Sequence, residues 1–285
     1  MKIINYKNFI ILIILILTAC DEIDNKTVFY SKIEDFKTGK TVLLEDFTGA
    51  NCTNCPNAAT VAENLQNALG EQLTVVSIHA GGFATDSFRT EAGNAYLQFF
   101  YPTGSEGYPA GMISRMKQSG GNFVEVNTAK WATYIIERLI SLSSANSQIP
   151  NIELNLSVDF NQIEGSFVVK SSITAHQQPK NALKLQLWII ENGIVSRQMG
   201  DGGGQYYKHN HVLRDAINGI WGEDISVNIN KTTDYISEKY FLSKLNTQLA
   251  PHNSGKVENM NIVGFIYDSA TKEVITVKKI MLISN

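Results

Sequence analysis

The chain has 285 residues, of which 44% are hydrophobic and 18% charged, and its formal net charge is −3. This length and composition are those of a globular protein with room for two domains of ordinary size. Three cysteines exclude a disulfide-dense scaffold, and because no long basic block is present, we expect no nucleic-acid partner.

Residues 1–19 are typical of a lipoprotein signal peptide. Lys2 and Lys7 supply positive charge, and the apolar run over residues 9–17 is too short to span a membrane. The following Leu17-Thr18-Ala19-Cys20 resembles the bacterial lipobox, so we expect cleavage after residue 19 and lipidation of Cys20. An ordinary cleavage site with an incidental cysteine is the alternative.

Residues 20–34 form the predicted lipidated tether. Its acidic start, Asp21, Glu22 and Asp24, resembles the stretch that directs Bacteroidota lipoproteins to the cell surface, with a plain acidic linker as the alternative. We expect an outer-membrane protein anchored by its N-terminal lipid, on the periplasmic or the cell-surface side. Disulfides persist in such an exported compartment.

Residues 35–147 alternate between predicted strands and helices, which indicates a β-α-β core with parallel pairing. Pro56 in the first turn and Gly70 just past the end mark the first helix. The expected strands are Thr41–Phe47, Leu73–His79 and Ala110–Met116, and the expected helices are Pro56–Leu69, Thr90–Phe100 and Asn127–Leu142.

Cys52 and Cys55 form a Cys-x-x-Cys pair between the first strand and the first helix. The amides and macrodipole at a helix N-terminus lower the pKa of a thiol and favour the nucleophilic thiolate. Lipidation of Cys20 would leave the two cysteines with no other partner in the chain, so we expect them to pair in a disulfide. The pair could exchange thiols and disulfides, or it could be inert or vestigial, because spacing does not show reactivity. No metal is expected here, since a zinc site would need further ligands.

The region over residues 35–144 resembles the thioredoxin fold. Thioredoxins carry a buried acidic residue six positions before the first cysteine and a cis-proline facing the pair, and Asp46 and Pro109 hold these places. The resemblance implies that an exposed Cys52 attacks a target disulfide, that Cys55 resolves the mixed disulfide, and that Asp46 accepts the Cys55 proton. Pro109 would present its loop to a substrate peptide.

His79 and the residues around the cysteines affect how such a site would work. His79 ends the second strand at the active-site side and could tune Cys52, although a simply hydrogen-bonded histidine is the alternative. Thioredoxins have Trp where this chain has Asn51, and Thr53-Asn54 is not a familiar redox dipeptide. The direction of electron flow is therefore not predicted.

A polar segment over residues 143–150 marks the expected domain boundary, and residues 150–285 are predicted to form an all-β immunoglobulin-like sandwich. Residues 206–251 are expected to hold a long loop or a short helix. The expected strands are Ile152–Phe160, Ser166–Ala175, Leu183–Glu191, Ile262–Tyr267 and Val274–Ile283.

Two motifs in this second region carry weak signals. The run over residues 201–204 is glycine-rich but lacks the Lys-Ser/Thr of a phosphate loop, so we expect a flexible loop. His209 and His211 share one face of a strand and could bind a metal with Glu223 or Asp224, but no third ligand has suitable spacing.

The lipobox, the Glu45–Gly49 lead into Cys-x-x-Cys-Pro and the Asn210–Arg214 segment together resemble the Omp28-type outer-membrane lipoproteins of the Bacteroidota. The resemblance implies a lipid-anchored α/β thioredoxin-like domain followed by a β-rich domain, and we expect no cofactor. Two functions stay open. One is thiol–disulfide exchange on envelope proteins or peptides, and the other is non-catalytic surface binding or adhesion with the thioredoxin-like domain as scaffold.

Overall fold

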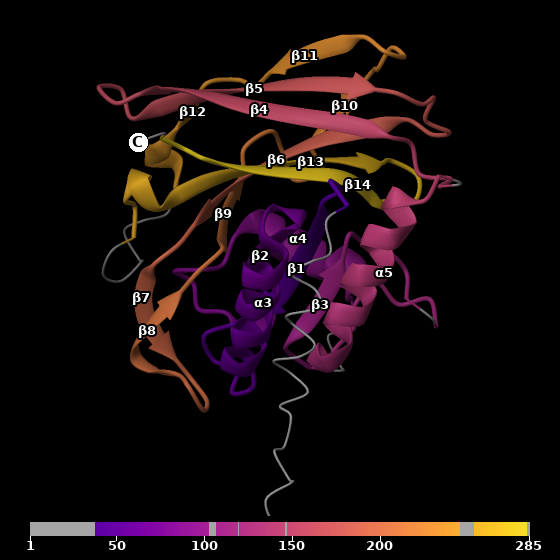
Figure 1. Cartoon of the computed structure of the whole chain (residues 1–285). Helices are drawn as coiled ribbons and strands as arrows, with labels where there is room; N and C mark the ends of the chain where they lie inside the picture. Colours follow the sequence, from indigo (N-terminus) through magenta and orange to yellow (C-terminus); the bar gives the residue numbers. More distant parts are fainter. Residues whose placement is uncertain (1–37, 103–106, 119, 146, 246–253, 284–285) are drawn as a thin grey trace, which may run out of the picture. The chain divides into compact units, whose positions relative to one another are not determined.

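The computed structural model describes residues 38–102, 107–118, 120–145, 147–245 and 254–283 (Figure 1). These residues belong to one compact unit. The predicted signal peptide over residues 1–19 and the lipidated tether over residues 20–34, which contains Cys20, lie outside the described residues.

Strands from both halves of the sequence join one eight-stranded sheet in the order β14-β13-β6-β9-β2-β1-β3, with β10 paired to β6. The halves meet where β2 runs parallel to β9, and the Ser77 N–H donates to the His211 carbonyl at 2.8 Å. The fold is therefore mixed α/β and rich in strands, and strands from both sides of residues 143–150 lie in one sheet. The strands are β1 Val42–Thr48, β2 Leu73–His79, β3 Ala110–Ile113, β6 Leu183–Glu191, β9 Val212–Ala216, β10 Glu223–Ile225, β13 Met260–Asp268 and β14 Val274–Met281.

The elements expected in the first half are present with small changes at their ends. β1 and β2 are parallel and mostly buried, and β3 pairs antiparallel with β1. β3 ends three residues earlier than predicted, because Ser114 and Arg115 adopt φ values of 47° and 54° and turn the chain. The helices are α3 Cys55–Leu69, α4 Glu91–Phe100 and α5 Trp131–Ser143.

The second half forms a four-stranded sheet that packs on the larger one (Figure 1). In this sheet β5 lies between β4 on one side and β11 and β12 on the other. Apolar side chains of β4 and β5 share a core with those of β6, β13 and β14. The four-stranded sheet is thus one layer, and β6, β13 and β14 form the other. This second layer belongs to the same sheet as β1, β2 and β3. The added strands are β4 Ile152–Asn161, β5 Ser166–Ala175, β11 Thr232–Ile236 and β12 Tyr240–Phe241.

The described part of residues 206–251 contains one of the expected alternatives, a short 3-10 helix at Leu242–Lys244, but it also contains short strands that were not predicted. These strands are separated by tight turns, so no single stretch shows a long alternating pattern. The first of them, β8 Gly204–His209, pairs with β7 Ile194–Gln198 in a separate two-stranded sheet. We call residues 194–209 the β7–β8 hairpin. In Figure 1 it extends from the neighbourhood of β9 alongside α3.

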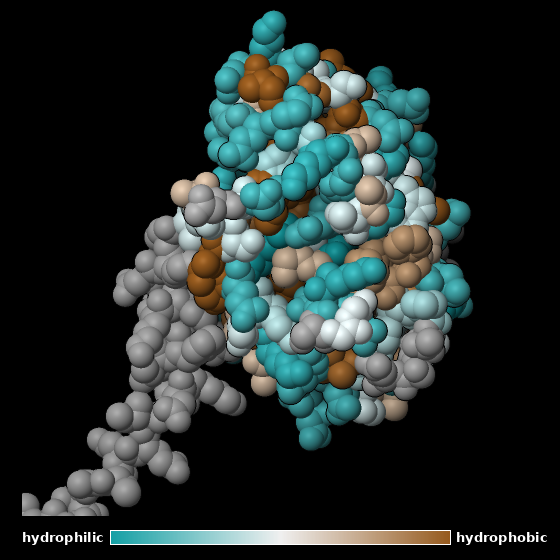
Figure 2. All heavy atoms as spheres, turned by 90° about the vertical axis from the view of Figure 1, so that its right-hand side faces the viewer, coloured by the Kyte–Doolittle hydropathy of each residue, from teal (hydrophilic) through white to brown (hydrophobic). Residues whose placement is uncertain are grey.

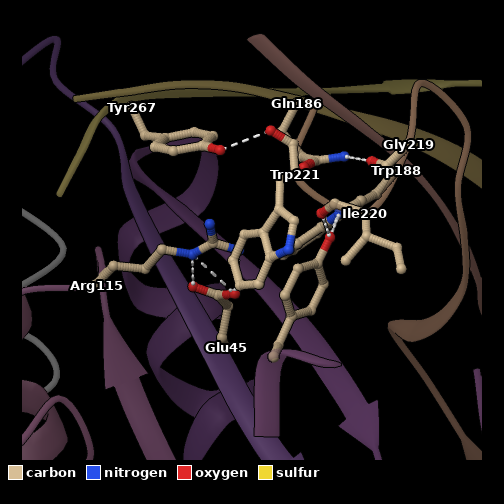
Figure 3. Close-up of polar contacts among 9 residues, drawn as sticks. Glu45, Arg115, Gln186, Trp188, Gly219, Ile220, Trp221 and Tyr267 are labelled. Atoms are coloured by element: carbon tan, nitrogen blue, oxygen red, sulfur yellow. Dashed lines mark hydrogen bonds and ion pairs between the residues drawn. The ribbon is translucent and has the colours of Figure 1, made fainter. Parts of the chain in front are cut away.

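A buried ion pair of the first half lies where the two halves of the sequence pack together (Figure 3). The Arg115 guanidinium donates to the Glu45 carboxylate at 2.9–3.2 Å, and both side chains are fully buried. Aromatic rings from α4, β6 and β13 surround the guanidinium carbon at 4.9–5.5 Å, namely Tyr96, Phe100, Trp188, Phe265 and Tyr267. A guanidinium over aromatic faces is stabilised by their quadrupoles. Separating the halves would expose this centre, so it fixes β1 and β3 against β6 and β13.

Candidate redox site

The expected disulfide between Cys52 and Cys55 is present at the N-terminus of α3. The chain leaves β1 at Thr48, turns through a loop in which the Cys52 N–H donates to the Gly49 carbonyl at 3.0 Å, and enters the helix at Cys55. Pro56 follows in the first turn, where its missing N–H costs no helix hydrogen bond. The local sequence therefore places the cysteine pair between a buried strand and a helix, as predicted.

Asp46 lies on β1 with only 1% of its surface exposed. Burial raises the pKa of its carboxyl group to about 7, and its Oδ1 atom has no hydrogen-bond partner among the described residues. A carboxyl group with a pKa near the working pH can both accept and release a proton. Asp46 therefore has the proton affinity that a general base beside a thiol needs.

A cavity of about 30 Å³ connects Asp46 to Cys55. His79, Tyr207 and His209 also line it. A volume of this size holds a water molecule, and a polar wall with unpaired atoms favours one. The structure thus brings the second cysteine and the buried carboxyl group to the same small polar space.

His79 ends β2 and is buried in this cavity wall. Its ring packs on Phe88 at 4.6 Å and lies 5.4 Å from the His209 ring. Burial, followed by the charges of His209 and Arg214, holds the His79 pKa well below its usual value, so the ring is neutral at pH 7. Its Nδ1 atom is buried and makes no hydrogen bond to a described residue. A role in tuning Cys52 stays a prediction.

The Tyr108–Pro109 peptide bond is cis, which agrees with the cis-proline implied by the thioredoxin resemblance. Pro109 is followed by β3, in which Ala110 pairs with Phe47 and Gly111 with Asp46. The proline loop therefore lies at the end of β1 from which the cysteine loop departs. The Tyr108 hydroxyl donates to the Ala80 carbonyl at 3.1 Å and ties this loop to the end of β2.

Cys52 is not exposed, contrary to the expectation, because both cysteines have only 2% of their surface exposed. The β7–β8 hairpin covers the loop before α3. Its Gln198 side-chain amide donates to the Gly49 carbonyl at 3.1 Å and to the Cys52 carbonyl at 2.9 Å. On the other side of the loop, the Asn51 N–H donates to the Phe83 carbonyl at 2.9 Å. The cysteine loop is held between these two segments.

Gly200, which directly precedes the glycine-rich run over residues 201–204, is part of this cover. A Cβ atom at Gly200 would lie 1.8 Å from the Thr53 carbonyl oxygen, so only glycine fits against the cysteine loop at this position. Sequence reasoning missed Gln198, Gly200 and the contribution of His209 to the cavity. The glycine run next to a short polar strand was the only signal of a close backbone approach.

The residues of the weak metal hypothesis do not come together. His209 faces the cavity beside Asp46, whereas His211 Nε2 lies 3.5 Å from Glu63 Oε2 on α3. Glu223 and Asp224 lie on β10 beside β6. In the part of the chain that the structure describes, no group of three or more His, Cys, Asp or Glu side chains could hold a metal ion.

The fold and site define a strand-rich α/β protein with a covered Cys-x-x-Cys disulfide. The family described as "Outer membrane protein Omp28" matches residues 93–285, so the chain belongs to the Omp28 family and is an outer-membrane protein. The match includes Pro109 and the β7–β8 hairpin but begins after Cys55. No helix of the described residues is long and apolar enough to cross a membrane.

Two solved structures are similar to this chain. HBP35 of Porphyromonas gingivalis has a TM-score of 0.65 at 16% identity, and the match covers 85% of this chain and 75% of that one. A domain of the outer membrane lipoprotein Omp28 from Porphyromonas gingivalis has a TM-score of 0.31 at 23% identity and covers 47% of this chain and 89% of that one. The similarity to HBP35 shows a shared fold, whereas the TM-score of 0.31 for the Omp28 domain is too low to show one. No curated protein matches the sequence significantly.

Proposed function

We propose that this protein is a lipid-anchored outer-membrane protein that exchanges thiols and disulfides with envelope proteins or peptides through Cys52 and Cys55. One observation carries the proposal: Cys55 and the buried Asp46 carboxyl group, whose pKa is about 7, line one water-sized cavity. A purely structural disulfide needs no such base, and closing so short a loop stabilises a fold only weakly.

The exchange takes place in two steps. The Cys52 thiolate attacks one sulfur of a target disulfide, a bond forms between those two sulfurs, and the other target sulfur leaves as a thiolate that takes a proton from water. Cys55 gives its proton to Asp46 and attacks Cys52 Sγ. The Cys52–Cys55 disulfide forms, the second target sulfur leaves as a thiolate that takes up the proton from Asp46, and two electrons have passed to the target. A dithiol protein would reduce the pair again, and the reverse sequence oxidises a target dithiol.

The arrangement around the cysteines supports a thioredoxin-like unit within the larger sheet. A buried strand, the cysteine loop and α3 follow one another, with Asp46 below the pair and Pro109 at the end of the same strand. The similarity to HBP35 supports the fold alone. Lipidation of Cys20 is part of the proposal and rests on the lipobox.

The proposal is tested by reduction of a peptide disulfide under dithiothreitol, followed for the wild-type chain, Cys52→Ser and Cys55→Ser. We expect the wild type to accelerate reduction and both variants to lose that acceleration. Asp46→Asn should slow the reaction most between about pH 7 and pH 8.5, where Asp46 is ionised and can accept a proton while the Cys55 thiol is still protonated. Equal rates for wild type and Cys52→Ser would contradict the proposal.

The burial of both cysteines favours a second candidate, a non-catalytic surface binding or adhesion lipoprotein with the thioredoxin-like unit as scaffold. Figure 2 shows a mainly hydrophilic face on which apolar residues occur in small separate groups. Such a face suits polar recognition more than a broad apolar interface. A disulfide that stays intact under strong dithiothreitol would favour this candidate.

A further inference from the structure

The tip of the β7–β8 hairpin, residues 197–204, touches the cysteine loop mainly through polar and main-chain contacts. The Met199 N–H donates to the Ala50 carbonyl at 2.8 Å, and Arg197 Nη1 lies 3.4 Å from Asn51 Oδ1. The Gln198 amide bonds described above complete the contact. Only Gln198 is buried in this tip, and the neighbouring residues are half-buried or exposed.

The base of the hairpin is attached differently. Ile194 is fully buried in an apolar cluster with Ala50, Phe88 and Val212. Asparagine side chains fix the two chain ends, since Asn210 Oδ1 accepts from the Gly193 N–H at 3.0 Å and Asn192 Oδ1 from the His211 N–H at 2.8 Å. Opening is easiest where few apolar contacts are buried, so the tip opens at a lower free-energy cost than the base.

We propose that the hairpin tip is a displaceable cover that selects which partners reach Cys52, admitting an extended polypeptide segment and excluding folded surfaces. The tip contacts the backbone on both sides of Cys52, at Ala50 and at Thr53, so a partner that approaches Cys52 from this side meets the tip first. An extended segment can replace the main-chain hydrogen bond from Met199 to the Ala50 carbonyl, because any peptide N–H is the same donor. A rigid folded surface offers no such replacement. The inference rests on the proposed exchange function and names its substrate class.

Two glycines of the tip form a matched pair for the test. A Cβ atom at Gly200 would collide with the Thr53 backbone, whereas one at Gly202 would meet only Pro56 Cβ at 3.7 Å, an ordinary contact. Both glycines have positive φ values, 99° and 78°. Gly200→Ala and Gly202→Ala therefore share backbone strain, and only the first forces the tip away from the cysteine loop.

The experiment measures alkylation of the reduced full chain by iodoacetamide and by a polyethylene-glycol maleimide, with the modified cysteines counted by mass. We expect the bulky reagent to modify Cys52 roughly tenfold faster in Gly200→Ala than in wild type. A tenfold change in rate corresponds to the net free energy of about one hydrogen bond between the tip and the cysteine loop. Gly202→Ala should match wild type. Gln198→Ala, which keeps the backbone unstrained, should give a smaller increase of several-fold.

The alkylation rates test the cover, and the reduction of disulfides tests the exchange function, so a failure of one is distinguishable from a failure of the other. If the bulky reagent modifies wild type as fast as Gly200→Ala and Gln198→Ala, the cover does not exist, whatever the exchange activity. If the variants open the site and reduce a folded protein disulfide faster than wild type, the inference holds. If they open the site and no form reduces any disulfide, the selection of partners is overturned together with the proposed function, while the alkylation rates still report the opening.

Discussion

The Arg115–Glu45 centre and the Cys52–Cys55 site are both buried, but their ionisable groups are satisfied in opposite ways. Arg115 has a carboxylate partner and five aromatic rings around it, although its Nη1 atom makes no hydrogen bond to a described residue. Asp46 and His79 at the cysteine site have buried atoms without hydrogen-bond partners, and burial shifts the pKa of both towards the neutral form. Paired buried charges fix a structure, whereas unpaired titratable groups around a cavity indicate a place where protons move.

Glu45→Gln should have the largest effect, because it leaves the Arg115 charge buried without a counter-ion. We expect a loss of about 3–5 kcal/mol in the free energy of unfolding, measured by chemical denaturation. Asp234→Asn removes the exposed pair between Lys170 and Asp234 and should leave the midpoint unchanged. Equal, small effects of both changes would contradict the structural role of the buried centre.

Asp46→Asn should stabilise the protein at high pH. The folded pKa of Asp46 is about 7 against an ordinary 3.8, so between these values the folded state holds a proton that the unfolded state has released. Stability therefore falls as pH rises through this window, by up to about 4 kcal/mol. The variant lacks this loss, so its advantage over wild type should grow from pH 4 to pH 8. An advantage independent of pH would contradict the raised pKa.

His209→Phe should show the opposite dependence with a smaller size. Burial lowers the pKa of His209 to about 4 from its ordinary 6.5, so in this window the unfolded state binds the extra proton. The wild type therefore loses stability as pH falls from 6.5 to 4, by about 3 kcal/mol, and the variant does not. Denaturation midpoints of both proteins at pH 4.5 and pH 8 test this. A difference that stays constant would place His209 outside the buried cavity.

These two groups act against each other in the wild type. Asp46 lowers stability with rising pH over the whole range in which His209 raises it. The wild-type profile alone is therefore a poor test, and the variants must be compared with it at each pH.

The sequence was sufficient where the pattern is local. The apolar run at Leu73–His79 predicted β2, the proline and glycine around residues 56–70 predicted α3, and motif spacing identified Asp46 and Pro109. What it could not show depends on contacts between distant segments. Arg115 follows a short strand and precedes exposed Lys117, so nothing nearby marks it as buried.

The cover of the cysteine site is such a distant contact. Gln198 bonds to a carbonyl 146 residues earlier in the chain, and one exposed strand of the hairpin carries no apolar period. The joining of β2 to β9 is equally non-local, since a single parallel pairing at Ser77 and Val212 makes it. Patterns of period two predict strands but not their neighbours in a sheet.

The redox equilibrium of the Cys52–Cys55 pair tests the central claim most directly. The full chain is equilibrated with a series of reduced and oxidised dithiothreitol mixtures at pH 7, quenched by alkylation, and its free thiols at Cys52 and Cys55 are counted by mass. The account predicts a reversible transition in which both cysteines become free together, with the same midpoint from either direction. A pair that stays oxidised in fully reduced dithiothreitol, while the chain remains folded, would contradict it.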